Sequence, residues 1–198
     1  MAARGLGDVA AKFGLGYVHS APPGHERYTG HLVLPYMRPA GGDNGVATLR
    51  FRCIKDECVR APDGRFWFEH DQKEQHQGHG KYQSLPGDPP RLFNTAALLV
   101  ESPHIVLVEG EADAMAWDVA GVPAAGMPGT GTWRDYWHPA FYGYQSVFLI
   151  AEDEAGEACM DALASEMPNG KPIRLPDIDS NTLLLTEGPQ ALRERIGL

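Results

Sequence analysis

The segment HIVLVEGEADAMAWDVAG, residues 104–121, decides the fold of this chain. Its first part is a continuous apolar run that leads into Glu109 and Gly110, which is typical of a strand buried on both faces of a sheet. Its second part has apolar residues at helical spacing, and Gly121 ends that pattern. The segment therefore predicts a strand followed directly by a helix.

The same alternation continues along the second half of the chain. SVFLIA (146–151) predicts another buried strand, and EAGEACMDALASEM (154–167) predicts a helix that Pro168 ends. Two shorter segments predict a strand with a glycine-rich turn, VPAAGMPGTGT (122–132), and a last strand, KPIRLP (171–176). Because strands and helices alternate, we expect a parallel sheet with flanking helices.

The first half of the chain has a different pattern. HLVLPYM (31–37) and VATLRFRCI (46–54) predict an antiparallel pair around the turn RPAGGDNG (38–45), where Gly, Asn and Asp tolerate the backbone of a hairpin. GLGDVAAKFG (5–14) predicts a short helix. The polar stretch 55–90 predicts a long loop, interrupted by the short aromatic strand RFWFEH.

These patterns predict an α/β fold, with an α+β subdomain over residues 1–100 and a parallel-sheet subdomain over residues 101–198. A hydrophobic content of 43% in 198 residues is enough for a core. The sequence has no run of about 18 apolar residues and no secretory signal, so we expect a cytoplasmic protein without a membrane partner. Three cysteines are too few for a disulfide framework.

The net charge of −9 is unevenly distributed along the chain. Residues 1–108 contain 12 Lys and Arg against 11 Asp and Glu, whereas residues 109–198 contain 5 against 15. The average argues against a nucleic-acid partner, but the asymmetry indicates that the two halves have different tasks. The acidic half is either a solvated surface or a site for hard cations, which prefer oxygen ligands.

Acidic residues follow three of the predicted parallel strands. Glu109 closes the first strand, and Asp113 lies one helical turn beyond it. Glu152–Glu154 close a later strand, and Asp177 and Asp179 follow the last one. Ligands of parallel sheets bind at the carboxyl ends of the strands. Acids that converge there are tolerated when cations neutralise them, and Mg²⁺ is the natural candidate because it binds oxygen ligands together with substrate phosphates.

Three segments of the acidic half resemble the Toprim domain. VLVEGEADAMAWDVAG (106–121) resembles its first motif, and AEDEAGEACMDAL (151–163) is similar to its Asp-x-Asp motif with the following Ala-Gly. LPDIDSNTLLL (175–185) resembles the third, Asp-containing segment of phage relatives. The three segments occur in the order that the family has.

The front half narrows the resemblance to one group of Toprim proteins. Residues 3–53, which begin ARGLGDV and end TLRFRC, and the segment GKYQSLPGDPPRLFN (80–94) are similar to the amino-terminal part of the RNA polymerase domain of DnaG-type primases. The resemblance extends from about Arg4 to Leu185. It implies an enzyme that joins ribonucleoside triphosphates into short RNA primers on a single-stranded DNA template.

The resemblance also implies the metal site. Glu109 matches the motif glutamate and is expected to act as a metal ligand or proton acceptor. Asp153 matches a metal ligand, and Asp179 a further one; Glu152 and Asp113 complete the expected set. The cofactor is expected to be Mg²⁺ or Mn²⁺, with two or more ions, because transfer of a nucleotide needs metal ions at the reacting phosphate.

The second motif departs from the family pattern. If it is aligned on Ala155-Gly156 without a gap, the first Asp of the family falls on Ala151 and only Asp153 remains. If one residue is deleted, Glu152 takes the first position, and Asp153 or Glu154 takes the second. We favour the second alignment, because the first would place an alanine at a ligand position. Asp153 is kept in both.

Basic residues of the front half match the family's groove for nucleotide phosphates and template. Arg50, Arg52 and Lys81 are expected to line this groove. Tyr82 and Arg91 are expected there as well, since bases stack on aromatic rings and phosphates attract guanidinium groups.

The extent of the resemblance gives further expectations about partners. The sequence begins where the polymerase domain of the family begins and ends soon after Toprim, so we expect neither an amino-terminal zinc-binding domain nor a helicase domain in it. A separate zinc-binding primase subunit and a replicative helicase are the expected protein partners. The expected source is a bacteriophage or mobile element.

Two other functions and one other metal site stay open. The acids would equally serve a Toprim nuclease, and the altered second motif would also fit a non-catalytic accessory module that binds single-stranded DNA. Cys53 and Cys58 with His70, His76 and His79 suit zinc by ligand type. Their spacing is not that of a familiar zinc finger, so we expect a polar loop with an unliganded cysteine pair rather than zinc.

Overall fold

The computed structural model describes residues 1–39, 45–67, 73–176 and 178–198. Its contacts divide the chain into two compact units, which we describe separately. The parallel-sheet unit contains Met1–Lys12, Tyr36–Ala47 and Pro89–Leu198, and the antiparallel-sheet unit contains Phe13–Pro35 and Thr48–Asp88.

A four-stranded parallel sheet forms the centre of the first unit. Its spatial order is β6-β5-β7-β8, and each neighbouring pair is parallel. All six residues of β7 are buried, as the apolar run predicted. The α/β class and the parallel sheet are thus confirmed. The strands are β5 (His104–Val108), β6 (Ala124–Gly126), β7 (Ser146–Ala151) and β8 (Gly170–Arg174).

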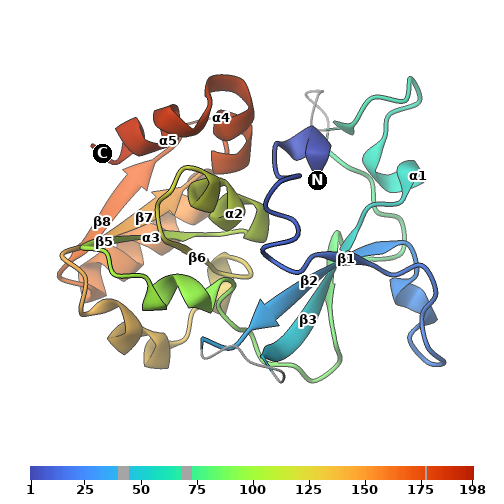
Figure 1. Ribbon diagram of the computed structural model, residues 1–198, viewed down its shortest axis with the longest axis horizontal. Coiled ribbons are helices and arrows are strands. Elements are labelled where there is room, and N and C mark those ends of the chain that lie inside the picture. The colour runs from blue at the N-terminus through green and yellow to red at the C-terminus, as the bar shows by residue number, and fades with distance from the viewer. Residues whose placement is uncertain (40–44, 68–72, 177) are drawn as a thin grey trace. The chain divides into compact units, whose positions relative to one another are not determined.

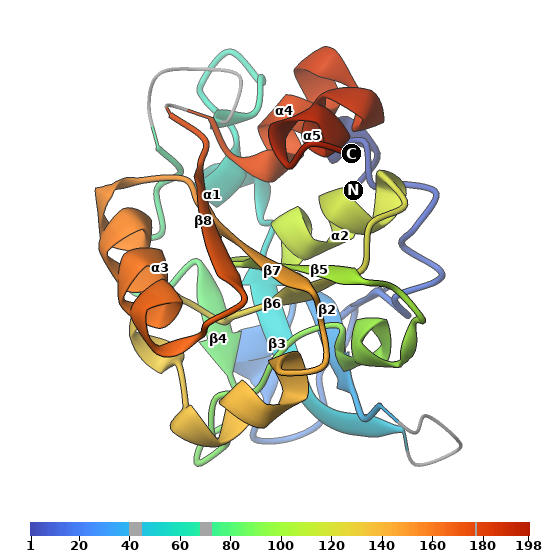
Figure 2. The same cartoon turned by 90° about the vertical axis from the view of Figure 1, so that its left-hand side faces the viewer.

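Helices cover both faces of this sheet (Figures 1 and 2). From β5 the chain crosses to β6 on one side, whereas from β7 it crosses to β8 on the other, so the order reverses between β5 and β7. Right-handed crossovers in opposite directions place their helices on opposite faces. Figure 2 shows α3 on one side and α2, α4 and α5 on the other. The helices are α2 (Glu111–Val119), α3 (Glu154–Glu166), α4 (Ser180–Glu187) and α5 (Pro189–Arg195).

The core of the parallel-sheet unit lies on both faces of the sheet. On the α3 face, Leu107 and Leu149 pack with Met160 in one cluster of buried residues. On the other face the fully buried Trp117 of α2 donates a hydrogen bond from its indole nitrogen to Ser180 Oγ, over 3.1 Å. This bond fixes the start of α4 against α2. Short 3-10 segments complete the unit: η1 (Ala2–Arg4), η4 (Thr95–Leu99), η5 (Thr130–Thr132) and η6 (Asp135–Phe141).

The helix predicted over residues 5–14 is wrong. The chain forms the 3-10 segment η1 and then a series of turns. Gly5 and Gly14 have φ angles of 65° and 62°, in the left-handed region that glycine tolerates and a right-handed helix excludes. The glycines of this stretch favour turns over the predicted helix.

The second sheet is antiparallel and has the order β1-β2-β3-β4. β3 pairs with β4 so that Arg52 lies opposite Tyr82 and Arg50 opposite Ser84. β2 and β3 are neighbours, as the hairpin pattern predicted, while residues 40–44 of the predicted turn lie outside the described residues. The strands are β1 (Gly16–Tyr17), β2 (His31–Met37), β3 (Val46–Cys53) and β4 (Tyr82–Ser84).

The long segment between β3 and β4 contains little regular structure. Its one described α-helix, α1 (Asp56–Val59), is a single turn. Elsewhere in the same unit, the 3-10 segment η2 (Glu26–Tyr28) precedes β2. Of the predicted aromatic strand, Phe66 forms an isolated bridge with Arg60, and residues 68–70 lie outside the described residues. The buried Tyr28 stacks on Phe51 of β3, with ring centroids 3.9 Å apart.

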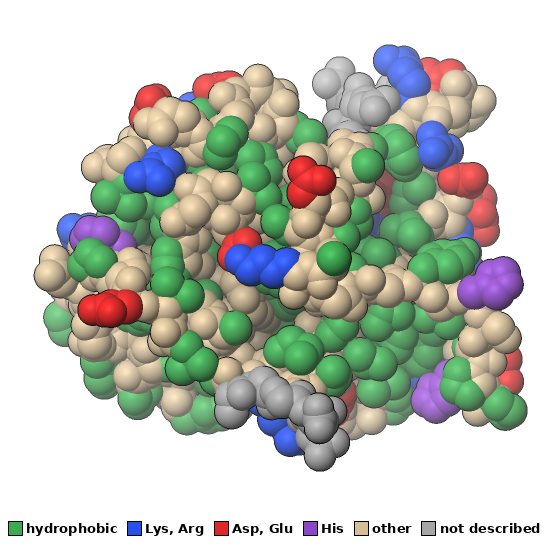
Figure 3. All heavy atoms as spheres, viewed as in Figure 1, with side chains coloured by type: hydrophobic (Ala, Val, Ile, Leu, Met, Phe, Trp, Pro, Cys, Tyr) green, Lys and Arg blue, Asp and Glu red, His purple; other side chains and the backbone are tan. Residues whose placement is uncertain are grey.

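The surface mixes charges of both signs. On the face drawn in Figure 3, acidic and basic side chains are interspersed among hydrophobic and polar groups. The excess of acid in the second half of the sequence therefore does not form a single acidic face in this view. Among the helices of the described residues, none has the length and apolar composition that a membrane crossing requires.

Candidate active site

Acidic side chains gather where the order of the parallel sheet reverses. Glu109 follows β5, and Glu152 and Asp153 follow the neighbouring strand β7. Crevices at such reversal points, outside the carboxyl ends of the strands, are the usual ligand sites of parallel sheets. The sequence prediction that the acids of different strands meet at one edge is therefore consistent with the topology.

Glu109 lies against the first turn of α3. A Cβ atom at Gly156 would collide with Glu109 Oε1, so any other residue at this position would have to displace the carboxylate. Glu109 Oε1 is buried and accepts no hydrogen bond from any described residue. Asp153 caps α3, and its Oδ1 accepts a hydrogen bond from the Gly156 backbone nitrogen over 2.8 Å. Glu109, Asp153 and Gly156 thus form one compact group.

A second group of acids surrounds the start of α4. Glu152 Oε1 accepts hydrogen bonds from the backbone nitrogen and the hydroxyl of Ser180, over 2.8 and 2.7 Å. Asp113 Oδ1 accepts one from the Asn181 backbone nitrogen over 3.1 Å. Asp179 caps α4 by accepting from the Thr182 nitrogen over 2.6 Å. Carboxylates at the positive end of a helix are favourable, which accounts for part of this arrangement.

Burial and mutual repulsion make three of these carboxyl groups, those of Glu109, Asp113 and Glu152, unusually weak acids. The pKa of Glu109 is raised to about 7, first by burial and then by the charges of Asp153 and Asp113. Burial, followed by the charge of Asp179, raises the pKa of Asp113 to about 7. The pKa of Glu152 is also raised, first by burial and then by Asp113. A bound cation would remove this repulsion, so the group is suited to hold one.

The structure also places the residues of the altered second motif. Ala151 is the last residue of β7, and its side chain is part of the buried core. Glu152 follows as a partly buried member of the acid cluster, Asp153 is exposed and caps α3, and Glu154 is the exposed first residue of α3. This placement supports the alignment with Glu152 in the first position. Asp177 lies outside the described residues.

One buried acid near the site was not predicted from the sequence. Glu111, at the first position of α2, is only 2% exposed, and its Oε1 accepts a hydrogen bond from the Tyr36 hydroxyl over 2.6 Å. Tyr36 in turn packs edge-on against Phe93. Helical spacing could have indicated that Glu111 points toward the core, but its tyrosine partner is 75 residues away in the sequence.

Four of the five predicted nucleotide- and DNA-binding residues meet on β3 and beside β4. The guanidinium carbons of Arg50 and Arg52 lie 4.8 and 5.2 Å from the centroid of the Tyr82 ring. Arg52 is buried and forms an ion pair with Glu74 over 2.6 Å. Lys81 Nζ is half exposed and lies 4.0 Å from Glu74 Oε2. Glu74, which the sequence did not single out, therefore organises this basic group.

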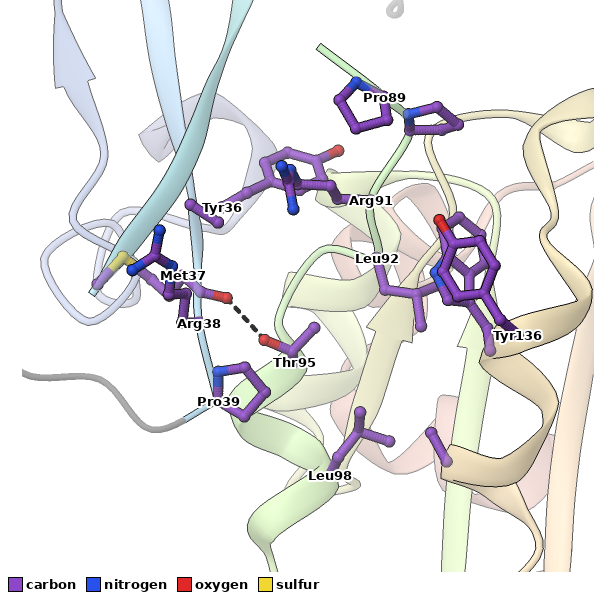
Figure 4. Close-up of a pocket in the computed structure, with 14 residues that line it drawn as sticks. Tyr36, Met37, Arg38, Pro39, Pro89, Arg91, Leu92, Thr95, Leu98 and Tyr136 are labelled. Carbon is purple, nitrogen blue, oxygen red and sulfur yellow. Dashed lines mark hydrogen bonds between the residues drawn. The ribbon is translucent and has the colours of Figure 1, made fainter. Parts of the chain in front are cut away.

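Arg91, the fifth residue, belongs to the parallel-sheet unit and lines a pocket of about 280 Å³ (Figure 4). Its Nε is buried without a hydrogen-bond partner among the described residues. Across the pocket the Thr95 hydroxyl donates to the Met37 carbonyl over 2.7 Å. Further lining residues include Tyr36, Arg38, Leu98 and Tyr136.

Comparison with known proteins gives one related sequence. No protein-family model matches the chain. The Gene 57 protein of Mycobacterium phage D29 is 35% identical to it over 172 residues, which cover 85% of this chain and 99% of the phage protein.

Solved structures share the fold at low sequence identity. The RNA polymerase domain of Mycobacterium tuberculosis primase DnaG matches with a TM-score of 0.70 at 19% identity, over 96% of this chain and 71% of that one. A DNA primase domain from Pseudomonas aeruginosa matches with a TM-score of 0.71 at 22% identity, over 99% and 69%. A DnaG primase catalytic domain bound to single-stranded DNA matches with a TM-score of 0.70 at 20% identity, over 98% and 68%.

These matches confirm the fold that the sequence motifs predicted. The chain belongs to the family of the Gene 57 protein of Mycobacterium phage D29, and its fold is that of the RNA polymerase domain of DnaG-type primases.

Proposed function

We propose that this chain is the catalytic core of a phage DNA primase, which joins ribonucleotides into short RNA primers on a single-stranded DNA template. One observation carries the proposal: the acid cluster lies at the order reversal of the parallel sheet, in a chain with the primase-core fold. Fold likeness alone does not define an activity. The conjunction of this fold with a metal-suited cluster at the expected place supports it.

The acid cluster would hold Mg²⁺ or Mn²⁺, with two or more ions. Glu109 and Asp153 are the proposed primary ligands, and the unsatisfied, buried Glu109 Oε1 supports this assignment. Such ions, when bound, activate the primer 3′ hydroxyl and stabilise the pyrophosphate that leaves. Glu152, Asp113 and Asp179 would complete the ligand set, and their bonds to the start of α4 keep that helix end at the site.

The alternative role of Glu109, if the other acids hold the ions, is that of a proton acceptor. A pKa raised to about 7 lies close to the working pH, where a carboxyl group both accepts and releases protons readily. The group lies against Gly156, without any described hydrogen-bond donor at Oε1, so this oxygen stays available. Asp153 is restrained by the cap bond of α3, which fixes its orientation toward the cluster.

The basic residues would bind phosphates of the nucleotide and of the template. Arg50 and Lys81 are the proposed direct contacts, and Tyr82 offers a ring on which a base stacks. Arg52 is buried against Glu74, so we assign it the role of positioning Tyr82. Arg91 would contact a phosphate from its pocket.

Single-stranded DNA and ribonucleoside triphosphates are the proposed substrates. The DnaG catalytic domain that matches this chain was solved with single-stranded DNA bound, which supports the template as a ligand. A separate zinc-binding primase subunit and a replicative helicase remain predicted partners. Action in the host cytoplasm is likewise a prediction.

The test is primer synthesis by the purified chain. Single-stranded DNA, labelled ribonucleotides and Mn²⁺ are incubated with the wild type, Glu109→Gln or Asp153→Asn. We expect RNA products from the wild type and a loss of roughly 100-fold or more in each variant, as for other electrostatic groups at reacting phosphates. The matched control is Glu101→Gln, which removes an exposed carboxylate before β5 and should keep full activity.

Other outcomes identify the alternatives. Unchanged product in Glu109→Gln would remove the assignment of the site. Metal-dependent cutting of the DNA, without RNA products, would favour a Toprim nuclease. DNA binding without either reaction would favour the accessory module.

A further inference from the structure

Two cysteines and two histidines converge in the antiparallel-sheet unit. Cys53 is the last residue of β3, and Cys58 lies in α1. His76 and His79 lie in the segment that leads to β4. One ligand atom from each of the four residues lies within 4.8 Å of the others. The side chains come from three separate stretches of chain, so their meeting is a property of the fold rather than of local sequence.

The distances within this cluster suit a tetrahedral metal ion. His79 Nε2 lies 3.2 Å from Cys53 Sγ and 3.8 Å from Cys58 Sγ. Zinc binds sulfur at about 2.3 Å and nitrogen at about 2.0–2.1 Å, so neighbouring ligand atoms of a tetrahedral zinc site are roughly 3.3–3.8 Å apart. The observed separations fall in or beside this range. The four residues already surround a space of the right size.

The outer nitrogens of both histidines have the partners that metal-bound histidines require. His79 Nδ1 lies 3.0 Å from the Gln77 carbonyl oxygen. A carbonyl only accepts, so Nδ1 carries the proton and the lone pair of Nε2 faces the thiols. His76 Nε2 lies 2.9 Å from Glu74 Oε2, which places the proton on Nε2. In metal sites, a ligating histidine usually donates its other ring N–H to a carboxylate or a backbone carbonyl in this way.

The inner nitrogen of His76 is a further indication. His76 Nδ1 is buried and has no hydrogen-bond partner among the described residues. A buried polar atom that is left unsatisfied is destabilising, so such an atom needs an explanation. A metal ion bound to Nδ1 would satisfy it. Hydrogen bonds among the described residues therefore do not satisfy His76 Nδ1, whereas a metal ion bound by all four residues would.

We propose that Cys53, Cys58, His76 and His79 bind one structural Zn²⁺ ion, at a site distinct from the acid cluster. Four protein ligands fill a tetrahedral coordination sphere and leave no position for substrate, as in structural rather than catalytic zinc sites. Sulfur and imidazole ligands select zinc over Mg²⁺, whereas the carboxylates of the acid cluster have the opposite preference. His70, the remaining histidine considered in the sequence, lies outside the described residues.

The ion would add to a hydrophobic cluster that is small among the described residues of this part of the unit. The hydrophobic cluster here consists of Cys53, Cys58 and Val59, with Phe66 packed against them. Small folds with so little apolar burial are commonly stabilised by a metal. Backbone bonds already join the ligand-bearing stretches, from Gln75 N to the Cys58 carbonyl over 3.1 Å and from Cys53 N to the Lys81 carbonyl over 3.0 Å.

The site would also organise the basic group on β3 and beside β4. The Glu74 carboxylate contacts His76 through Oε2 and forms an ion pair with Arg52 through Oε1. Arg52 directly precedes Cys53, and Lys81 directly precedes β4. An ion bound at the cluster would therefore fix the stretches of chain that contain Arg52 and Lys81. This inference concerns the stability and shape of the antiparallel-sheet unit and does not depend on the proposed polymerase activity.

The first measurement is metal content. The full chain, purified in reducing buffer without chelator, should contain one zinc ion per molecule by plasma mass spectrometry. After exchange with Co²⁺ it should show the visible bands of tetrahedral cobalt and a sulfur-to-cobalt charge-transfer band. Cys58→Ser and His76→Gln should lose both signals. The matched controls Cys159→Ser and His25→Gln, which alter residues outside the cluster, should keep them.

A second variant separates ligand loss from unfolding. Glu74→Gln keeps all four ligands and removes the charge behind His76, so zinc affinity should fall by about 10–100-fold with the cobalt spectrum preserved. Folded, reduced wild-type protein without zinc and without a tetrahedral cobalt spectrum would overturn the proposal. A disulfide between Cys53 and Cys58 in the reduced preparation would also overturn it. Glu109→Gln should keep its zinc, so failure of the polymerase assignment is distinguishable.

Discussion

The acid cluster of the parallel-sheet unit and the Cys/His cluster of the antiparallel-sheet unit are opposite solutions to metal binding. In the first, oxygen ligands repel one another, and burial and neighbouring charges raise the pKa values of Glu109 and Asp113 to about 7. In the second, sulfur and imidazole ligands carry no such cluster of like charges, and each histidine is oriented by a fixed partner. The first arrangement suits ions that arrive and leave with substrate, and the second suits an ion that stays.

The largest expected effect is the loss of structure when zinc is removed. Chelation should lower the local stability of residues 46–84 by roughly 3 kcal/mol or more, because structural zinc contributes folding free energy directly. Amide hydrogen exchange of peptides from β3 and β4 should then become about 100-fold faster, whereas peptides from β5 and β7 should change little. Equal acceleration in both sheets would show that the two clusters are not energetically separate.

A smaller effect of the opposite sign is expected in the acid cluster. Glu109→Gln removes a repelled charge, so in magnesium-free buffer it should raise the free energy of unfolding by about 1–2 kcal/mol, after allowance for the solvent near this partly exposed group. The same variant should lose Mn²⁺ binding. Chemical denaturation and manganese titration measure the two quantities. A variant that is less stable without metal would contradict the repulsion argument.

The raised pKa values also predict a dependence of stability on pH. Between about pH 4.5 and 7 the folded chain keeps protons on Glu109 and Asp113 that the unfolded chain releases. The free energy of unfolding in magnesium-free buffer should therefore fall as the pH rises through this window. Saturating Mg²⁺ should reduce or reverse the slope, because the ion competes with these protons.

Denaturation curves at pH 5.5 and pH 8, each with and without Mg²⁺, measure this dependence. The Glu109→Gln variant serves as the matched control, since it should show a smaller slope than the wild type. A metal-free chain that gains stability across this window would contradict the prediction.

A last pair of variants, which includes the smallest expected effect, distinguishes the acids of the second motif. Glu152→Ala removes two hydrogen bonds to Ser180 and should cost about 1–3 kcal/mol. Glu154→Ala alters an exposed side chain and should change stability by less than about 0.5 kcal/mol. Thermal unfolding of both variants, with primer synthesis measured alongside, tests the difference. Equal effects of the two variants would contradict the alignment that places Glu152 in the first position of the second motif.

The parallel sheet could be predicted because its signals are local. The buried runs of β5 and β7 and the helical spacing of α2 and α3 each lie within one stretch of sequence, and the crossover rules then bring Glu109 and Asp153 to one edge. The helix predicted over residues 5–14 was wrong, although the signal against it is also local. The glycines of this stretch favour turns.

The ligands of the Cys/His cluster could be named from the sequence by their type, but their convergence could not be predicted because it depends on a long path of chain. Nothing in the spacing of Cys58 and His76 shows that the segment between them returns to β3. Glu74 was missed in the same way, since its roles as partner of both Arg52 and His76 exist only after folding. Spacing rules for zinc sites describe familiar loops, and this loop is not one of them.

Gly156, in the first turn of α3, is a part of the candidate active site that carries no charge. Glu109 occupies the volume that a side chain at Gly156 would fill. A single methyl group at position 156 would displace this carboxylate without altering any charge or removing any ligand. The space that Gly156 leaves free is therefore as important for the position of Glu109 as the neighbouring acids are. A search for site residues that considers only polar side chains would miss Gly156.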